Sequence, residues 1–267
     1  MGKTQQIIER RVDELRQNMF VIHQLVIRDK KRSLSSTFMG ELWEVINPLI
    51  NMVVMVLVFS EMFGKGVAGA FPLYVLTGTT IYGLFNSGTS TCLNALTENK
   101  SFLIKTQLKK NMYVLEKILV ALRNFLFSLL IYAFVIALYR IPPSVTWLLF
   151  IPDILLMLVM MLGIGKILAI INVTFADITY FYKIFTLFLM YGSAIFYRVD
   201  RLSPTMQKCM TILNPLYTVI SIARECVMER MYPNWKLWVI IGVYAVICYI
   251  VGTVVFNRKI EDIVARL

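Results

Sequence analysis

The stretch 147–172, WLLFIPDILLMLVMMLGIGKILAIIN, decides the class of fold. Its only charged residues are Asp153 and Lys166. A helix needs about 20 consecutive apolar residues to cross the hydrocarbon core of a bilayer. Five further apolar stretches approach that length, at about 46–63, 71–91, 116–139, 180–197 and 236–257. The sequence therefore predicts an all-α integral membrane protein with six transmembrane helices.

The composition points to the same class. Of the 267 residues, 58% are apolar and only 16% are charged. A soluble domain of this length needs more polar residues to cover its surface, which excludes ordinary soluble enzymes, disordered chains and coiled coils. The 27 Lys and Arg residues against 16 Asp and Glu give a net charge of +11. This excess suits anionic lipid head groups or phosphate-bearing cargo, whereas the apolarity argues against nucleic acid.

The distribution of positive charge predicts the orientation. Lys and Arg number eight in residues 1–45, four in the loop between the second and third spans, and three in the tail 258–267. The loops 64–70 and 140–146 carry one each. Because cytosolic loops collect Lys and Arg, we expect both termini in the cytosol. No cleaved signal peptide is expected, since residues 1–45 carry charges throughout.

The segment 1–45 is predicted to lie outside the spans. Apolar residues recur every three or four positions over 4–27, which is typical of an amphipathic helix. We interpret it as a helix in the membrane interface, with a short coiled-coil seam as the alternative. A basic cluster, RDKKR, follows at 28–32 and suits lipid phosphates. The predicted organisation is 1–45 at the interface, 46–257 in the membrane and 258–267 as a cytosolic tail.

The segment of about 198–235 departs from the charge rule, because it holds five Lys and Arg residues on the predicted outer side. Ser203-Pro204 and Asn214-Pro215 are both signals for the start of a helix. They predict two short helices, neither long enough to cross the membrane. We interpret the pair as a re-entrant helical hairpin before the last span. The alternative is a helical cap on the outer surface.

Charged and aromatic residues inside the spans are candidates for a substrate path. Arg123, Lys166 and Lys183 lie near the predicted cytosolic ends, where they either reach the head groups or form a cationic mouth for an anionic substrate. Aromatic rings can provide a surface for sugar rings, although interface belts and core packing explain many of them equally well. The aromatic candidates are Tyr74, Tyr82, Phe85, Tyr182, Tyr191 and Tyr197.

Motifs for catalysis and for nucleotide binding are missing from the sequence. No G-x-x-x-x-G-K-[ST] loop occurs, so ATP hydrolysis is not expected in this chain. The four cysteines show no C-x-x-C spacing and His23 is the single histidine, so no metal site is expected. We expect a chain that is not an enzyme and binds no cofactor.

Three motifs near the N-terminus carry a family resemblance: Arg28-Asp29-Lys30-Lys31, Gly40-Glu41-Leu42-Trp43 and Asn47-Pro48-Leu49. With them the chain resembles the permease subunit of type 2 ABC exporters for polysaccharides, the group that moves O-antigen and teichoic-acid chains. Leu103-Ile104-Lys105 and Asn214-Pro215-Leu216 with Arg224 add to the likeness, as does Asn172-Val173 with Asp177. The chain departs from the pattern at Ser33, Leu34, Ser35 and Lys110.

The resemblance implies a homodimer in the bacterial plasma membrane, driven by two ATP-binding cassette subunits that hold ATP and magnesium. The implied cargo is a lipid-pyrophosphate-linked glycan. A permease for a drug or other small hydrophobe and an integral-membrane enzyme acting on a lipid are the alternatives. A coupling loop at about 92–113 would contact the ATPase through Glu98, Lys100, Phe102, Leu103, Ile104 and Lys105. The interface or gate segment would hold Arg28, Asp29, Lys31, Gly40, Trp43, Asn47 and Pro48, and the outer hairpin Pro204, Asn214, Pro215 and Arg224.

Overall fold

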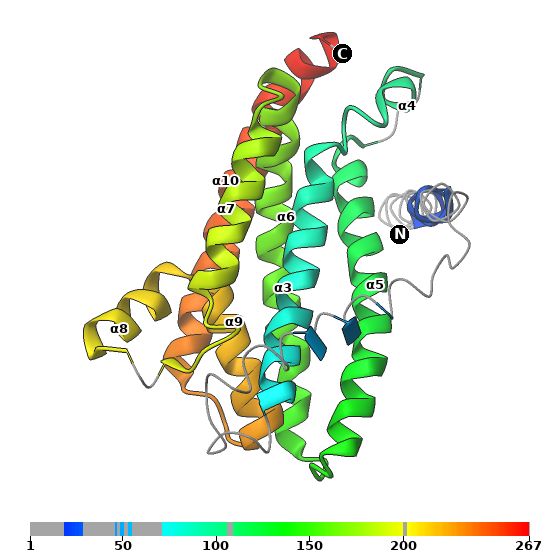
Figure 1. Ribbon diagram of the computed structural model, residues 1–267. Helices are drawn as coiled ribbons and strands as arrows, with labels where there is room; N and C mark the ends of the chain where they lie inside the picture. Colours follow the sequence, from blue (N-terminus) through cyan, green and yellow to red (C-terminus); the bar gives the residue numbers. More distant parts are fainter. Residues whose placement is uncertain are drawn as a thin grey trace, which may run out of the picture.

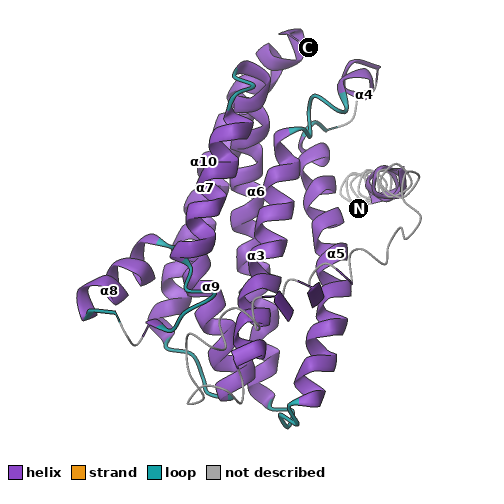
Figure 2. Ribbon diagram, viewed as in Figure 1, coloured by secondary structure: helices purple, strands orange, loops and turns teal. Residues whose placement is uncertain are grey.

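The computed structural model describes residues 19–28, 46, 49–50, 53–54, 71–105, 109–199 and 202–266. Every regular element in these ranges is helical, as Figure 2 shows. The predicted all-α class is confirmed. The first predicted span, 46–63, and the first half of the predicted interface helix lie mostly outside the described residues, although Met19–Arg28 is helical.

The helices of the bundle run side by side in Figure 1. α6 packs on both α3 and α10, and α5 packs on α3. One end of the bundle carries α4 and the C-terminus and is called the α4 end; the opposite end, where α5 turns into η2, is called the η2 end. The bounds are α3 Phe71–Leu93, α4 Lys100–Lys105, α5 Asn111–Leu138, η2 Val145–Leu149, α6 Phe150–Thr174, α7 Ile178–Gly192, α8 Pro204–Leu213, α9 Pro215–Arg224, η4 Glu225–Glu229 and α10 Trp235–Arg266.

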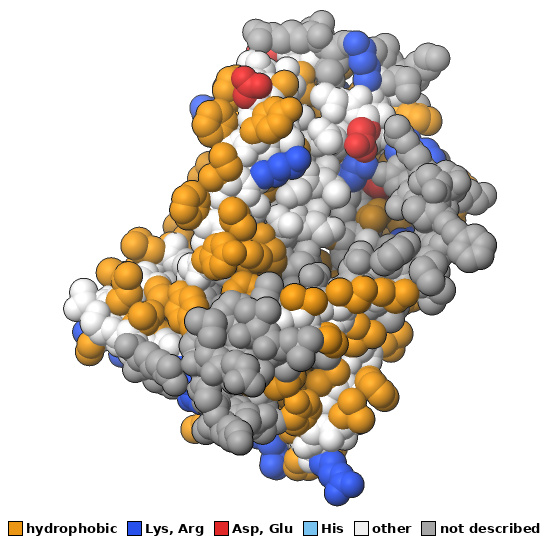
Figure 3. All heavy atoms as spheres, viewed as in Figure 1, with side chains coloured by type: hydrophobic (Ala, Val, Ile, Leu, Met, Phe, Trp, Pro, Cys, Tyr) orange, Lys and Arg blue, Asp and Glu red, His pale blue; other side chains and the backbone are white. Residues whose placement is uncertain are grey.

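Three segments of the described chain are long and apolar enough to cross a membrane: Asn111–Leu138, Val145–Thr174 and Trp235–Val264. They correspond to the third, fourth and sixth predicted spans. Large apolar side chains also cover much of the face drawn in Figure 3, whereas the acidic side chains on that face lie toward the α4 end. On α5, Leu126, Leu130, Phe134 and Leu138 recur every four residues and are all exposed. Such an apolar stripe is typical of a lipid-facing or subunit-facing surface.

α3 corresponds to the second predicted span but has a more polar composition, with seven threonines and serines. Its 23 residues are long enough to cross a bilayer. Buried threonines such as Thr77 and Thr89 donate their hydroxyls to backbone oxygens one turn earlier. This bonding, together with the packing of α5 and α6 against α3, makes the polar side chains acceptable in the interior.

The fifth predicted span, 180–197, is wrong as a continuous helix. α7 ends at Gly192, and residues 193–197 form a turn in which Ala194 has a left-handed φ of 50°. The 15 residues of α7 rise about 22 Å, which is shorter than the hydrocarbon core of about 30 Å. The Asn214 side chain donates to the Gly192 carbonyl and to Ser193 Oγ, which fixes this end. In Figure 1, α7 stops part way along the bundle, near the end of α8 and the start of α9.

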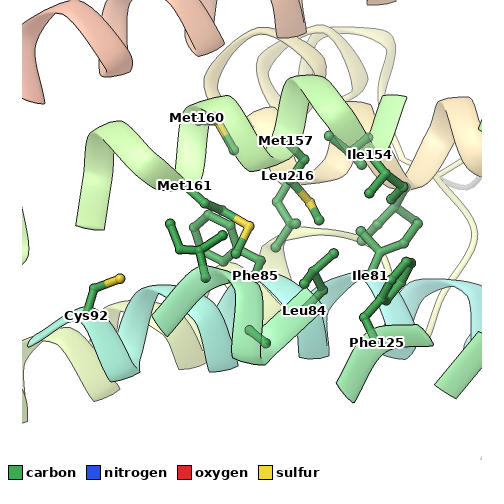
Figure 4. Close-up of a cluster of buried hydrophobic side chains, with 14 of the residues drawn as sticks. Ile81, Leu84, Phe85, Cys92, Phe125, Ile154, Met157, Met160, Met161 and Leu216 are labelled. Carbon is green, nitrogen blue, oxygen red and sulfur yellow. The ribbon is translucent and has the colours of Figure 1, made fainter. Parts of the chain in front are cut away.

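The core lies where α3, α5, α6 and α9 meet. Figure 4 shows Phe85 of α3, Met157 and Met161 of α6 and Leu216 of α9 in this cluster, together with Phe125 of α5. Elsewhere in the bundle, α6 and α10 touch backbone to backbone. A Cβ at Gly163 would overlap the Cys248 carbonyl oxygen, and a Cβ at Gly252 would overlap that of Gly163. Small residues permit such close approaches between membrane helices.

Candidate functional site

The α4 end of the bundle is held together by two buried asparagines. The Asn172 amide of α6 donates to the Leu93 carbonyl at 3.0 Å and to Asn94 Oδ1 at 3.2 Å. Its Oδ1 accepts from the Thr179 hydroxyl of α7 at 3.0 Å. One side chain therefore joins the end of α3, the end of α6 and the start of α7.

Asn99 performs the corresponding role for the segment that leads into α4. It is fully buried, and its amide donates to the Ala95 carbonyl at 2.9 Å. Its oxygen accepts from Arg28 Nη2 at 2.8 Å, and the Arg28 guanidinium lies 5.2 Å from the centre of the Phe102 ring. Helix 19–28 is thus linked directly to α4.

The predicted coupling residues occupy different environments. Glu98 forms an ion pair of 2.7 Å with Lys117 of α5, whose side chain is only 7% exposed. On α4, Phe102 is 42% exposed and Leu103 is buried. Lys100 is exposed. Ile104 and Lys105 belong to the α4 backbone, but their side chains lie outside the described residues.

Of the predicted interface or gate segment, Arg28 is described, and it contacts Phe102 of the predicted coupling residues and the neighbouring Asn99. The other six lie outside the described residues: Asp29, Lys31, Gly40, Trp43, Asn47 and Pro48.

The three predicted path cations lie on three different helices. Lys166 of α6 is buried and donates to the Thr253 hydroxyl of α10 at 2.9 Å. Its ammonium also lies 4.4 Å from the centre of the Tyr249 ring, a cation–π geometry. Arg123 of α5 is half-buried and bonds to the Asn124 side chain, and Lys183 of α7 is exposed. Lys166 therefore faces α10 of its own chain.

We expect Lys166→Met to retain the thermal stability of the protein or to raise it. A hydroxyl and an aromatic face compensate a buried ammonium only in part, and methionine fills a similar volume without a charge. Lys166→Ala leaves a cavity beside Tyr249 instead and should cost about 2–4 kcal/mol. Thermal unfolding of the purified variants measures both effects. An equal loss in the two variants would show that the charge itself stabilises the α6–α10 contact.

The predicted path aromatics largely connect α3 with α7 and the turn after it. The Tyr82 hydroxyl donates to the Thr186 carbonyl at 3.1 Å, and the Tyr74 hydroxyl donates to the Tyr197 carbonyl at 2.9 Å. The Tyr197 hydroxyl in turn donates to the Tyr191 carbonyl at 3.0 Å. Phe85 and Tyr182 are buried, and Tyr191 is 57% exposed.

The segment predicted as an outer hairpin contains the two short helices expected from its proline signals. Ser203 accepts from the Met206 N–H at the start of α8, and Pro204 is the first helical residue. Asn214 accepts from the Leu216 and Tyr217 N–H groups at 3.1 Å, with Pro215 first in α9. The existence and starts of both helices are confirmed. A re-entrant position in the bilayer stays a prediction.

Arg224, at the end of α9, connects these short helices to the bundle. Its side chain is buried and donates to the carbonyls of Ala194 at 3.0 Å, Tyr74 at 3.1 Å and Ile195 at 3.3 Å. Its guanidinium carbon lies 3.3 Å from the centre of the Tyr74 ring. A Cβ at Gly78 would come within 3.0 Å of Nη2, so the glycine leaves room for the guanidinium.

Sequence reasoning missed Asn99 and Asn172 as joints between helices. In the sequence, Asn172 belongs to one of the motifs that carry the family resemblance, and Asn99 lies in the predicted coupling loop without being one of its predicted contact residues. A buried asparagine between apolar runs is the one signal that could have marked them, because a buried amide requires partners.

Within the described part of the chain, no group of three or more His, Cys, Asp or Glu residues could hold a metal ion.

Three long apolar helices, packed with α3 and joined at one end by buried amides, are typical of a helical membrane protein. The chain belongs to the ABC-2 type transporter family, whose sequence profile matches residues 21–228. It is similar to the O-antigen export system permease protein RfbA of Myxococcus xanthus, with 23% identity over 95% of this chain and 97% of that protein. Two RfbA proteins of Klebsiella pneumoniae are 25% and 23% identical, each over 86% of this chain and 88% of theirs. The resemblance found in the sequence is confirmed.

Proposed function

We propose that this chain is the membrane-spanning subunit of an ATP-driven exporter that moves a lipid-pyrophosphate-linked polysaccharide across the bacterial plasma membrane. The similarity to three O-antigen export permeases over 86–95% of the chain carries the proposal. Their named cargo favours a glycan over the alternative of a drug or small hydrophobe.

In this proposal, two copies of the chain enclose the path, and two ATP-binding cassette subunits hold ATP and magnesium. The α4 end faces the cytosol together with both termini, as the Lys and Arg counts favour. The η2 end then faces outward. Six spans result when 46–63, α3 and α7 with the turn after it are counted with the three long apolar segments.

The contacts of the coupling segment support a lever mechanism. A displacement of α4 reaches α5 through the Glu98–Lys117 ion pair and helix 19–28 through the Asn99–Arg28 hydrogen bond. Asn172 of α6 bonds to the end of α3 and to the start of α7, so the same displacement also reaches these three helices. Packed helices move as rigid bodies, so a push at this end is transmitted along the bundle.

An exposed cationic residue supports capture of a phosphate-bearing lipid. Lys183 is exposed, whereas Lys166 contacts Thr253 and Tyr249, and Arg123 is half-buried and bonds to the Asn124 side chain. Lys183 is therefore the strongest of the three candidates for a pyrophosphate mouth.

Phe102→Asp is expected to reduce the amount of ATPase subunit that co-purifies with the chain by about tenfold, which corresponds to about 1.4 kcal/mol. The exposed ring on α4 is suited to an apolar contact with a partner, and a carboxylate would have to be desolvated there. Phe102→Leu is the matched control, because it keeps the apolar contact. Equal recovery of the ATPase with both variants would exclude Phe102 from the docking surface.

Deletion of the chain tests the proposed cargo. Lipid-linked glycan should accumulate inside the cell while surface polysaccharide is lost, and the wild-type chain supplied from a plasmid should restore it. Unchanged surface polysaccharide, with altered tolerance to small hydrophobic drugs, would support the alternative cargo.

A further inference from the structure

A pocket of about 810 Å³ lies at the η2 end, between η4 and the first turn of α10. None of the sequence motifs above falls on it. Its lining includes two acidic residues, one basic residue, two aromatic residues and an amide: Glu225, Glu229, Lys236, Tyr232, Trp235 and Asn234.

The chain builds this pocket by an abrupt reversal. η4 is a π-helix that ends at Arg230, where φ is 56° and the backbone is left-handed. The Met231 N–H donates back to the Glu225 carbonyl at 2.9 Å. Asn234 Oδ1 then accepts from the Lys236 N–H at 3.1 Å and fixes the start of α10. The pocket is therefore formed by fixed backbone, without help from a ligand.

The side chains around the pocket combine flat aromatic faces with hydrogen-bond acceptors. Tyr232 is 75% exposed and Trp235 is 68% exposed, so both rings are available to a ligand. Glu225 is half-buried, and Glu229 follows one turn later and is exposed. Burial raises the pKa of the Glu225 carboxyl, and the nearby Glu229 raises it further. Two acidic groups are thus held close together beside two rings.

This combination selects among ligand classes. The two carboxyl groups outnumber the single ammonium of Lys236, so the lining disfavours a phosphate or another anion. A metal ion is disfavoured, because among the described residues no third His, Cys, Asp or Glu completes a set of ligands. A sugar ring offers hydroxyl groups to carboxylates and an amide, and an apolar C–H face to tyrosine or tryptophan. A neutral polyhydroxylated ring matches the lining best.

We propose that this pocket binds sugar units of the exported glycan on the outer side of the membrane. The inference rests on the proposed function, which places the η2 end outside and supplies the glycan. The site guides the chain as it leaves the path and is separate from any pyrophosphate mouth at the α4 end. Glu229, Tyr232 and Trp235 are exposed, so short unlipidated saccharides should bind without ATP or the ATPase subunit.

Binding can be measured on the full-length chain in nanodiscs made without sugar-based detergent. The probe is a set of oligosaccharides, released without lipid from the surface polysaccharide of the producing bacterium. We expect saturable binding that weakens at least fivefold in Tyr232→Ala and in Glu229→Gln. Both residues are exposed, so the substitutions leave the fold intact. Tyr180→Ala is the matched control, because Tyr180 is 68% exposed but lies in the first turn of α7, at the α4 end.

The outcomes separate this inference from the proposed function. Absence of saturable binding, or equal binding by wild type and both pocket variants, overturns the pocket assignment even when deletion abolishes surface polysaccharide. A second result also overturns the pocket assignment: brominated lipids quench the fluorescence of Tyr232→Ala less than that of the wild type, while saccharide binding is unchanged. This result assigns the rings to the lipid interface. If the purified chain binds saccharide but cells that lack the chain keep normal surface polysaccharide, the proposed function is overturned and the pocket assignment is not.

Discussion

Gly252→Ala is expected to destabilise the protein severely, and Gly252→Leu to prevent recovery of folded protein. The added Cβ would overlap the backbone of Gly163 in α6, so no change of side-chain rotamer relieves the clash. The helices must separate instead, and the buried residues of α10 lose their contacts with α6. Overpacking a tight site costs about 1–3 kcal/mol, and a backbone overlap belongs at or above the upper end of that range. A protein has only about 5–15 kcal/mol of stability to lose.

Gly242→Ala is the matched control on the same helix. Nothing lies within 4 Å of a Cβ at Gly242, so we expect an unchanged or slightly higher unfolding temperature. The yield of monodisperse protein and its thermal unfolding compare the two variants. If Gly252→Ala unfolded at the same temperature as Gly242→Ala, the backbone contact between α6 and α10 would be refuted.

Arg224→Met is expected to release the turn 193–197 from α3 and α9. The substitution removes the guanidinium donors to the Tyr74, Ala194 and Ile195 carbonyls. The Ala194 carbonyl keeps the Tyr74 hydroxyl as a donor at 3.3 Å. Hydrogen bonds from a charged group contribute about 1.5–3 kcal/mol each, so we expect a total loss of about 3–5 kcal/mol. Arg224→Lys should recover only part of this loss. One ammonium cannot reproduce the hydrogen bonds of a planar guanidinium that also lies on the Tyr74 ring.

Thermal unfolding and limited proteolysis measure the effect of Arg224→Met. Arg198 is already exposed, so release of the turn should speed trypsin cleavage after it by freeing the backbone, while the rest of the bundle stays resistant. Arg230→Gln is the control, because Arg230 is exposed and only six residues away. Wild-type stability and proteolysis in Arg224→Met would mean that the three carbonyls find other donors, and that Arg224 does not hold the turn.

The sequence predicted the long helices well because their signal is local. The apolar run 147–172 corresponds to η2 and α6 over 145–174, and the third and sixth predicted spans correspond to α5 and α10. The starts of α8 and α9 were also predictable. Ser203-Pro204 and Asn214-Pro215 each combine a capping side chain with a residue that needs no backbone donor.

The fifth predicted span shows where local reasoning failed. Apolar and aromatic residues resume after Gly192-Ser193 and continue to Tyr197, so hydropathy extends the predicted span past Gly192, although glycine is common at helix ends. The stop is also fixed from a distance, by the Asn214 amide on the Gly192 carbonyl and the Arg224 guanidinium on the Ala194 carbonyl. Both donors bind backbone oxygens, which every residue possesses, so the side chains of 180–197 do not reveal these two contacts.

The sequence by itself determined that this protein is helical and embedded in a membrane, because apolar runs and capping pairs act through nearby residues. Short motifs such as Asn47-Pro48-Leu49 carried the resemblance to the family. Only the tertiary structure decided that α7 ends part way along the bundle and that Lys166 turns to α10. It also decided that Asn99, Asn172 and Arg224 join separate elements. These features depend on side chains that bond to partners far away in the chain, and the packing of the helices alone determines which partners they meet.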